Sequence, residues 1–165
     1  FKVNNFFKIP EPLIQNEFSR IMSLKDGLRK MSKSEPSDLS RINLTDDKDQ
    51  IVNKIKKAKT DTLPLPFKDD DLENRPEVKN LFGIYSSLIS SDLKKTIKDF
   101  SGKNFSDFKE VLTEVLVEKI VPISTEIKKL LNDKSYLDKI LSDGSKKADE
   151  IASKKVKKIH EIIGF

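Results

Sequence analysis

Two lysines spaced three residues apart, Lys30 and Lys33, are the residues whose type and spacing best suit chemistry. They belong to the segment Lys30-Met31-Ser32-Lys33-Ser34, called here the lysine loop. An ammonium group is a compact positive charge on a flexible stem, and serine hydroxyls can donate hydrogen bonds to the oxygens of an anion. We therefore predict that the lysine loop is a mobile, cationic segment that binds an anion. A chain with 32 lysines and arginines also produces this spacing by chance, so the flanking sequence must decide.

The composition limits which other kinds of catalytic or metal site the chain could contain. The 165-residue chain has no cysteine, and its only histidine, His160, lies near the C-terminus among lysines, where a surface position is expected. Disulfides and thiolate metal sites are thereby excluded, and we expect no protein metal site. The longest apolar runs are only a few residues, so no membrane-spanning segment is expected. No signal or transit peptide is visible.

The net charge of +5 suits a polyanionic partner. Nearly all of the positive charge is lysine, however, because arginine occurs only at positions 20, 29, 41 and 75. Lysines of this kind also coat any solvated helix face. Both interpretations of the lysine clusters stay open from the sequence alone.

Residues 1–44 are irregular and rich in loops. Prolines at positions 10 and 12 block a helix there. The apolar stretch Ile21–Leu24 suggests the end of a buried strand, and Asp26-Gly27 suggests a turn. Residues 1–4 also resemble a strand, and because the chain does not begin with methionine we expect an N-terminal portion to be missing.

From Thr45 onward, apolar residues recur every three or four positions, which is typical of amphipathic helices. Expected helix starts are Thr45, Pro76, Asp92 and Ser106, followed by a short helix over 135–141 and a last helix from Ser145, separated by Gly144. Residues 62–68 contain two prolines and are expected to form a linker. We therefore predict a mainly α chain with about five to six helices and only vestigial strand near residues 1–24.

Several segments flank the lysine loop in a recognisable order: Arg20-Ile21-Met22-Ser23-Leu24 before it, Thr45-Asp46-Asp47 and Lys57-Ala58-Lys59-Thr60-Asp61 after it, and later Asn80-Leu81-Phe82-Gly83-Ile84-Tyr85 and Gly144-Ser145-Lys146-Lys147-Ala148. In their order and spacing these segments resemble the C-terminal half of a bacterial or mitochondrial tryptophanyl-tRNA synthetase, a class I aminoacyl-tRNA synthetase with a KMSKS nucleotide-binding signature. One departure is Glu35, where the family usually has aspartate. A second is that the HIGH-type motif and the tryptophan pocket of the family are not in this chain.

The resemblance implies a tryptophan–tRNA ligase that activates tryptophan with ATP and then transfers it to tRNA(Trp). Negative charge builds on the phosphates during activation, so positioned positive charge is needed more than a covalent catalyst. By resemblance, Lys30 and Lys33 are the catalytic residues and Ser32 and Ser34 bind phosphate oxygens. Met31 and the backbone of Ile21 would line the adenine pocket, although Ile21 by itself reads as a core residue. Mg²⁺ is expected to accompany ATP.

The resemblance also implies two domains. Residues 1–44 would be the C-terminal remnant of a Rossmann nucleotide-binding fold carrying the lysine loop, and residues 45–165 a helical tRNA/anticodon-binding region whose last helix packs back on the catalytic domain. Homodimerisation of the full-length enzyme is expected, in the bacterial cytoplasm or in the mitochondrial or organellar matrix. Candidate phosphate contacts are the lysines at 54, 56, 57, 94, 95, 98, 154, 155, 157 and 158. No anticodon-reading residue can be named.

A rival hypothesis is a non-catalytic helical RNA-binding or interaction module of synthetase ancestry. The enzyme requires an attached nucleotide-binding domain upstream, about 160–200 further residues from ordinary domain lengths, and the module does not. In either case we expect residues 1–165 alone to be inactive in tryptophan activation.

Overall fold

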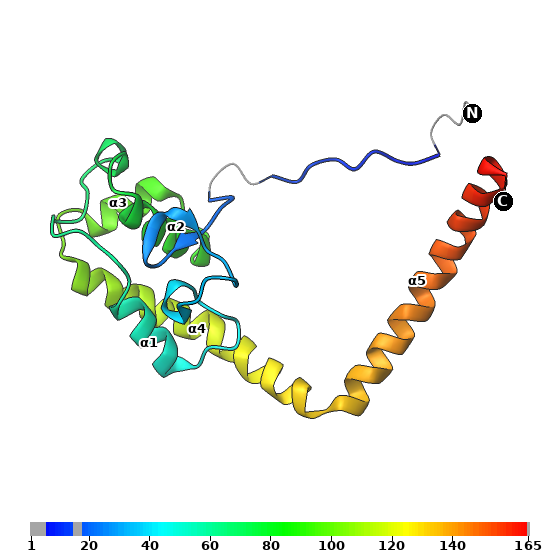
Figure 1. The fold of residues 1–165 in the computed structure, drawn as a ribbon. Helices are drawn as coiled ribbons and strands as arrows, with labels where there is room; N and C mark the ends of the chain where they lie inside the picture. The colour runs from blue at the N-terminus through cyan, green and yellow to red at the C-terminus, as the bar shows by residue number, and fades with distance from the viewer. Residues whose placement is uncertain (1–5, 15–17, 165) are drawn as a thin grey trace. The chain divides into compact units, whose positions relative to one another are not determined.

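The computed structural model describes residues 6–14 and 18–164. The chain divides into two compact units, Ile14–Glu126 and a second unit made of Phe1–Leu13 with Ile127–Phe165. The described residues form five α-helices: α1 (Lys48–Lys56), α2 (Pro76–Leu88), α3 (Leu93–Phe100), α4 (Phe105–Asn132) and α5 (Lys134–Ile163). Figure 1 labels these helices. Of two short 3₁₀ turns, η1 (Asp38–Ser40) precedes α1 and η2 (Asp69–Leu72) lies between α1 and α2 in the sequence. The strand expected at residues 1–4 lies outside the described residues.

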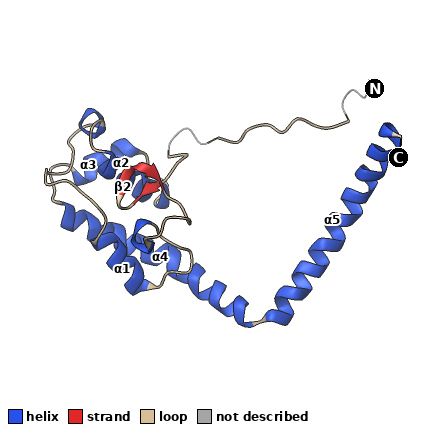
Figure 2. Ribbon diagram, viewed as in Figure 1, coloured by secondary structure: helices blue, strands red, loops and turns tan. Residues whose placement is uncertain are grey.

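A single two-stranded antiparallel sheet accompanies the helices in the described part of the chain (Figure 2). Its strands are β1 (Met22–Ser23) and β2 (Asp26–Lys30), with Met22 opposite Lys30 and Ser23 opposite Asp26. The mainly helical fold with little strand is therefore as predicted.

The turn predicted at Asp26-Gly27 is wrong, because both residues belong to β2 and the chain reverses at residues 24–25. Gly27 serves packing instead. A Cβ atom at this position would lie 2.5 Å from the carbonyl carbon of Pro76 at the start of α2. Glycine lets the hairpin backbone approach the helix this closely.

The hydrophobic core of the Ile14–Glu126 unit contains fully buried residues from the hairpin and from α1 to α4. Phe108 of α4 is central, with ring centroids 4.8 Å from Phe82 and 4.9 Å from Phe100 in edge-on arrangements. Leu24 from the hairpin and Ile51 and Ile55 from α1 join the same cluster. The hairpin and α1 are thus held by one core, which spans both sides of the expected domain border at residues 44 and 45.

Helix starts follow the predictions in part. Pro76 is the first residue of α2, and the Asp92 side chain accepts a hydrogen bond from Lys95 N at 2.7 Å to cap α3, both as expected. The cap of α1 is not Thr45 but Asp47, which forms a reciprocal capping box with Gln50.

The α4 cap is also different from the prediction. Asn104, rather than Ser106, receives the amide of Asp107 at 3.0 Å. Three residues separate the capping oxygen from the amide it accepts, and only the earlier position satisfies this spacing.

Residues 62–68 are irregular, but they are not a free linker. Leu65 and Pro66 are buried, and Leu65 exchanges backbone hydrogen bonds with Gly102 and Lys103 at 3.2 and 3.0 Å. Gly102 adopts a positive φ of 69°, which favours glycine. The segment therefore forms part of the packed unit.

In the second unit, α5 is one uninterrupted helix of 30 residues. The predicted break at Gly144 is wrong. A single glycine inside a helix costs about 1 kcal/mol relative to alanine and, unlike proline, keeps its backbone donor. Lys155 of α5 donates a hydrogen bond to the carbonyl of Phe6 and lies 3.9 Å from the centroid of its ring.

Candidate functional site

The lysine loop begins where β2 ends, at Lys30. The amide of Met31 donates to the carbonyl of Ile21 at 3.0 Å, which fixes these two predicted adenine-site residues side by side. Ser32 then closes a turn, because its side-chain oxygen accepts from Ser34 N at 3.2 Å. Ser32, Lys33 and Ser34 are exposed, whereas Ile21 and Met31 are half-buried and pack against the core.

A hollow of ≈ 540 Å³ lies beside the loop. Five of the six predicted site residues line it, Ile21, Lys30, Met31, Ser32 and Lys33, while Ser34 does not. Its other walls come from residues that sequence reasoning did not assign to the site: Ser19, Arg20, Arg41, Ile42, Asn43, Leu44 and Thr45.

The charged side chains that line this hollow are all positive. Its lining includes four cationic side chains, those of Arg20, Lys30, Lys33 and Arg41, and no carboxylate. Within the described part of the chain, the ammonium groups of Lys30 and Lys33 have no hydrogen-bond or ion-pair partner. Unpaired cations that surround a hollow with an apolar wall are suited to an anion carrying a flat apolar group.

Asn80 of α2 holds the hairpin that carries the loop. Its side-chain oxygen accepts from Met22 N at 2.8 Å, and its side-chain nitrogen donates to Met22 O at 2.8 Å. The amide of Asn80 thus pairs with β1 as a neighbouring strand would. The signal in the sequence was a polar residue within the apolar face of a helix, which calls for a buried partner.

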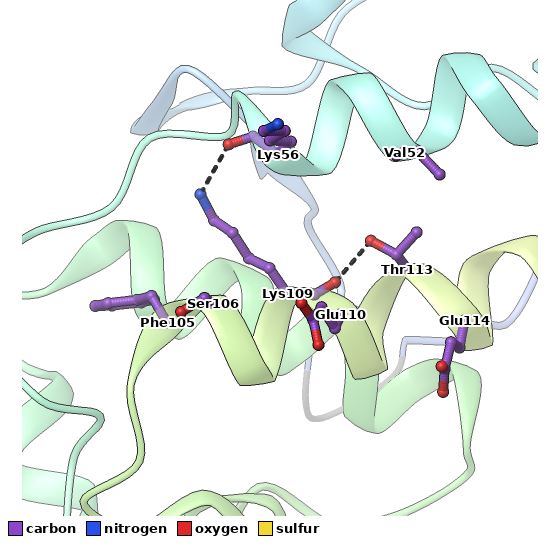
Figure 3. A pocket seen from close by; sticks show the side chains of 8 residues that line it. All are labelled: Val52, Lys56, Phe105, Ser106, Lys109, Glu110, Thr113 and Glu114. Atoms are coloured by element: carbon purple, nitrogen blue, oxygen red, sulfur yellow. Dashed lines mark hydrogen bonds between the residues drawn. The ribbon is translucent and has the colours of Figure 1, made fainter.

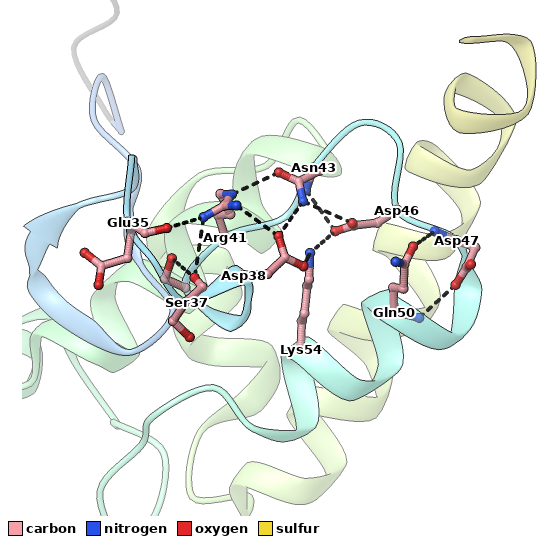
Figure 4. A network of polar contacts seen from close by, with 10 residues as sticks. Glu35, Ser37, Asp38, Arg41, Asn43, Asp46, Asp47, Gln50 and Lys54 are labelled. Carbon is pink, nitrogen blue, oxygen red and sulfur yellow. Dashed lines mark hydrogen bonds and ion pairs between the residues drawn. The ribbon is translucent and has the colours of Figure 1, made fainter. Parts of the chain in front are cut away.

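An ion pair joins the two ends of the lysine loop, since Arg29 Nη2 lies 3.2 Å from Glu35 Oε2. Glu35, where the family usually has aspartate, keeps the carboxylate needed for this pair. Arg41 supports the same end of the loop, because its Nη1 donates to the carbonyls of Glu35 at 2.9 Å and Ser37 at 3.4 Å (Figure 4).

A buried ion cluster continues from Arg41 to α1. Lys54 is only 2 % exposed and lies 2.7 Å from a carboxylate oxygen of both Asp38 and Asp46 (Figure 4). The Lys54 hydrogen bond holds the pKa of Asp38 below its ordinary value, with Asn43 adding to the effect. Lys54 is therefore not a surface phosphate contact, and its inclusion among those candidates is wrong.

A larger hollow of ≈ 630 Å³ lies elsewhere, along α1 and α4, and is lined by none of the residues predicted to bind ATP (Figure 3). There Lys109 reaches across from α4 and donates to the carbonyls of Lys56 at 3.3 Å and Ala58 at 2.7 Å. Burial lowers the pKa of Lys109. These bonds satisfy the last carbonyl of α1 and a carbonyl just beyond the helix, so they explain this lysine structurally.

Within residues 6–14 and 18–164, no group of three or more histidine, aspartate or glutamate side chains is placed to hold a metal ion. Among the described helices, none is both long and apolar enough to cross a membrane.

Comparison with known proteins shows the family of this chain. Residues 1–121 match the family described as tRNA synthetases class I (W and Y). The chain belongs to this family. The tryptophan–tRNA ligase of Mesorhizobium japonicum is 49% identical over 163 residues, and that of Rickettsia felis is 51% identical over 158 residues.

Solved structures agree with this assignment. Tryptophanyl-tRNA synthetase from Mycoplasma pneumoniae superposes with a TM-score of 0.76 at 26% identity, covering 92% of this chain and 45% of that one. The Campylobacter jejuni synthetase complexed with ADP and tryptophan superposes with a TM-score of 0.67, also at 26% identity, covering 99% of this chain and 49% of that one.

This class I synthetase chain spans less than half of the relatives that it matches. The Mesorhizobium match covers 99% of this chain but 46% of the relative, and the Rickettsia match covers 96% and 47%. The resemblance to a C-terminal half is consistent with these shares.

Proposed function

We propose that the whole protein is a tryptophan–tRNA ligase and that this chain supplies its phosphate-gripping loop and its helical portion. The observation that carries the proposal is the lysine loop, whose two unpaired ammonium groups face a hollow with cationic and apolar walls and no carboxylate. Membership of the class I family and close identity to ligases of this type support the same function.

In the proposed reaction, the carboxylate of tryptophan attacks the α-phosphate of ATP and pyrophosphate leaves. Lys30 and Lys33 stabilise the charge that develops on the phosphates, and the loop hydroxyls of Ser32 and Ser34 donate to phosphate oxygens. The half-buried side chain of Met31 and the backbone of Ile21 line the adenine position. Mg²⁺ enters as part of the ATP substrate.

The second half of the proposed reaction transfers tryptophan to tRNA(Trp). In this proposal residues 1–44 belong to the catalytic domain, and the helical region from residue 45 onward would receive the tRNA. The exposed lysines among the candidate phosphate contacts remain candidates: Lys56, Lys57, Lys94, Lys95, Lys98, Lys154, Lys155, Lys157 and Lys158. A homodimer, and packing of the last helix against the catalytic domain, belong to the same proposal.

The test is aminoacylation by the whole protein, with tRNA, ATP and either tryptophan or tyrosine. We expect charging with tryptophan only. Charging with tyrosine would refute the amino-acid assignment. Binding of tRNA without charging would favour the non-catalytic RNA-binding module instead.

A further inference from the structure

Lys54 occupies a buried position that is unusual for a lysine. It is 2 % exposed, next to the core residues Ile51 and Ile55 of α1. Lysine is almost never fully buried without a partner, and a well-packed apolar residue is often at least as stabilising as a buried ion pair. Stability alone therefore does not account for this side chain.

The two carboxylates around Lys54 differ in their surroundings. Asp46 is buried beside the start of α1, and its side chain also accepts from Asn43 N at 2.8 Å. Asp38 has a side chain that is 53 % exposed and belongs to η1, which follows the lysine loop. Lys54 thus links one carboxylate fixed at α1 to a second on the loop's outgoing segment.

From Asp38 the contacts lead back to the loop. Asp38 Oδ1 lies 3.1 Å from Arg41 Nη2 and accepts from Asn43 Nδ2 at 2.9 Å. Arg41 then donates to the carbonyl of Glu35, whose own amide donates to Ser32 O at 3.4 Å. Arg41 and Asn43 also line the hollow that Lys30 and Lys33 line. The ion pair of Asp38 and Lys54 therefore supports residues that line the hollow and residues at the end of the loop.

We propose that Asp38 and Lys54 are positioning residues that hold the lysine loop in the geometry needed for ATP activation. Neither residue lines the hollow, so both act through Arg41 and the backbone at Glu35. This inference rests on the proposed function, because the effect of Asp38 and Lys54 is measured as a rate of ATP activation. Lys54 supplies an anchor fixed in the core, and Asp38 transmits that anchor to an otherwise exposed loop.

Asp38→Ala in the whole protein is the sharpest variant, since it cuts the connection on the loop side and leaves Lys54 paired with Asp46. We expect kcat of tryptophan-dependent ATP–pyrophosphate exchange to fall about 10- to 100-fold, as for a misplaced catalytic group. The KM for tryptophan should stay within about twofold, because only an interaction of the transition state is lost. Asp38→Asn, which keeps one acceptor oxygen, should lose less.

A double-mutant cycle with Lys33→Ala separates positioning from general structural support. If Asp38 acts by placing Lys33, then adding Asp38→Ala to Lys33→Ala should lower kcat by less than about threefold. The same cycle with Lys30→Ala tests the other lysine of the loop. Multiplicative losses in both cycles would show that Asp38 does not act through the loop, and would overturn the proposal. Lys54→Arg should retain more activity than Lys54→Met, because only arginine can still pair with both carboxylates.

Asp49→Ala is the matched control, because Asp49 is an exposed aspartate in the first turn of α1 and removes the same charge. It should leave kcat unchanged. Thermal unfolding of every variant identifies any that no longer fold. If Asp38→Ala does not fold, Asp38→Asn replaces it in the double-mutant cycle. An active wild type with an unchanged Asp38→Ala variant would overturn this inference alone, whereas an inactive wild type would overturn the proposed function and the inference together.

Discussion

Replacing Asn80 by leucine tests how the hairpin that carries the lysine loop is held. The Asn80 side chain is 7 % exposed and makes two hydrogen bonds of 2.8 Å with the backbone of Met22. Leucine fills a similar volume but leaves one amide and one carbonyl of β1 without their partners. Each unpaired buried group costs about 1–3 kcal/mol.

The expected loss follows from the environment of these groups. Met22 is half-buried, so water reaches part of its backbone and the lower half of that range applies. We expect the free energy of unfolding to fall by about 2–4 kcal/mol, measured by urea or guanidinium titration with an unchanged m-value.

Lys79→Leu is the control, because Lys79 is the exposed neighbour of Asn80 on α2. It should change the free energy of unfolding by less than about 0.5 kcal/mol. A loss below about 0.5 kcal/mol for Asn80→Leu would refute the argument, since the hairpin would then be held by other contacts.

Three further predictions concern the close packing of the hairpin, the pH dependence of stability and the isolated chain. Gly27→Ala should destabilise the protein by about 1–3 kcal/mol in denaturant titration, because the new methyl group overlaps the backbone of Pro76; wild-type stability would contradict the close approach. The Lys59 hydrogen bond at 2.7 Å, with coulombic attraction and hydrogen bonds from the backbone, lowers the pKa of Glu77 despite burial. The ionised Glu77 carboxylate therefore stabilises the folded protein at pH values above its unfolded pKa of about 4.3. This contribution is lost as the pH falls through the lower pKa that Glu77 has in the folded protein. Glu77→Gln should flatten the acid limb of stability below about pH 5, and an unchanged limb would show that Glu77 does not carry it. Residues 1–165 alone should show no tryptophan-dependent pyrophosphate exchange, and exchange above background would mean that the active site has been misplaced.

Local patterns in the sequence were sufficient to predict a mainly helical chain and the starts of two of its helices. The three- and four-residue periodicity, Pro76 and Asp92 set α2 and α3, because helix formation depends on side chains a few residues apart. Misinterpretations occurred where one residue type has two uses. Gly27 permits close packing rather than a turn, and Gly144 is tolerated within α5 rather than ending a helix.

The supporting side chains of the site could not be predicted in the same way. Asn80 and Met22 are 58 residues apart, so no local pattern connects them. Lys54 looked like any other lysine late in a helix, yet the tertiary fold places it between two carboxylates. The sequence located the groups that carry charge, whereas the contacts that orient them depend on the packed fold.

The most direct measurement of the central claim is the rate of tryptophan-dependent ATP–pyrophosphate exchange by the whole protein with Lys33→Ala. Lys33 lines the hollow, and its ammonium group has no partner among the described residues. Loss of one transition-state charge contact is worth about 2–4 kcal/mol, so the rate should fall about 10²–10³-fold. Tryptophan affinity, measured separately by equilibrium binding, should stay within about twofold. An unchanged exchange rate, or equal losses of rate and tryptophan affinity, would contradict the assignment of the lysine loop as the phosphate grip.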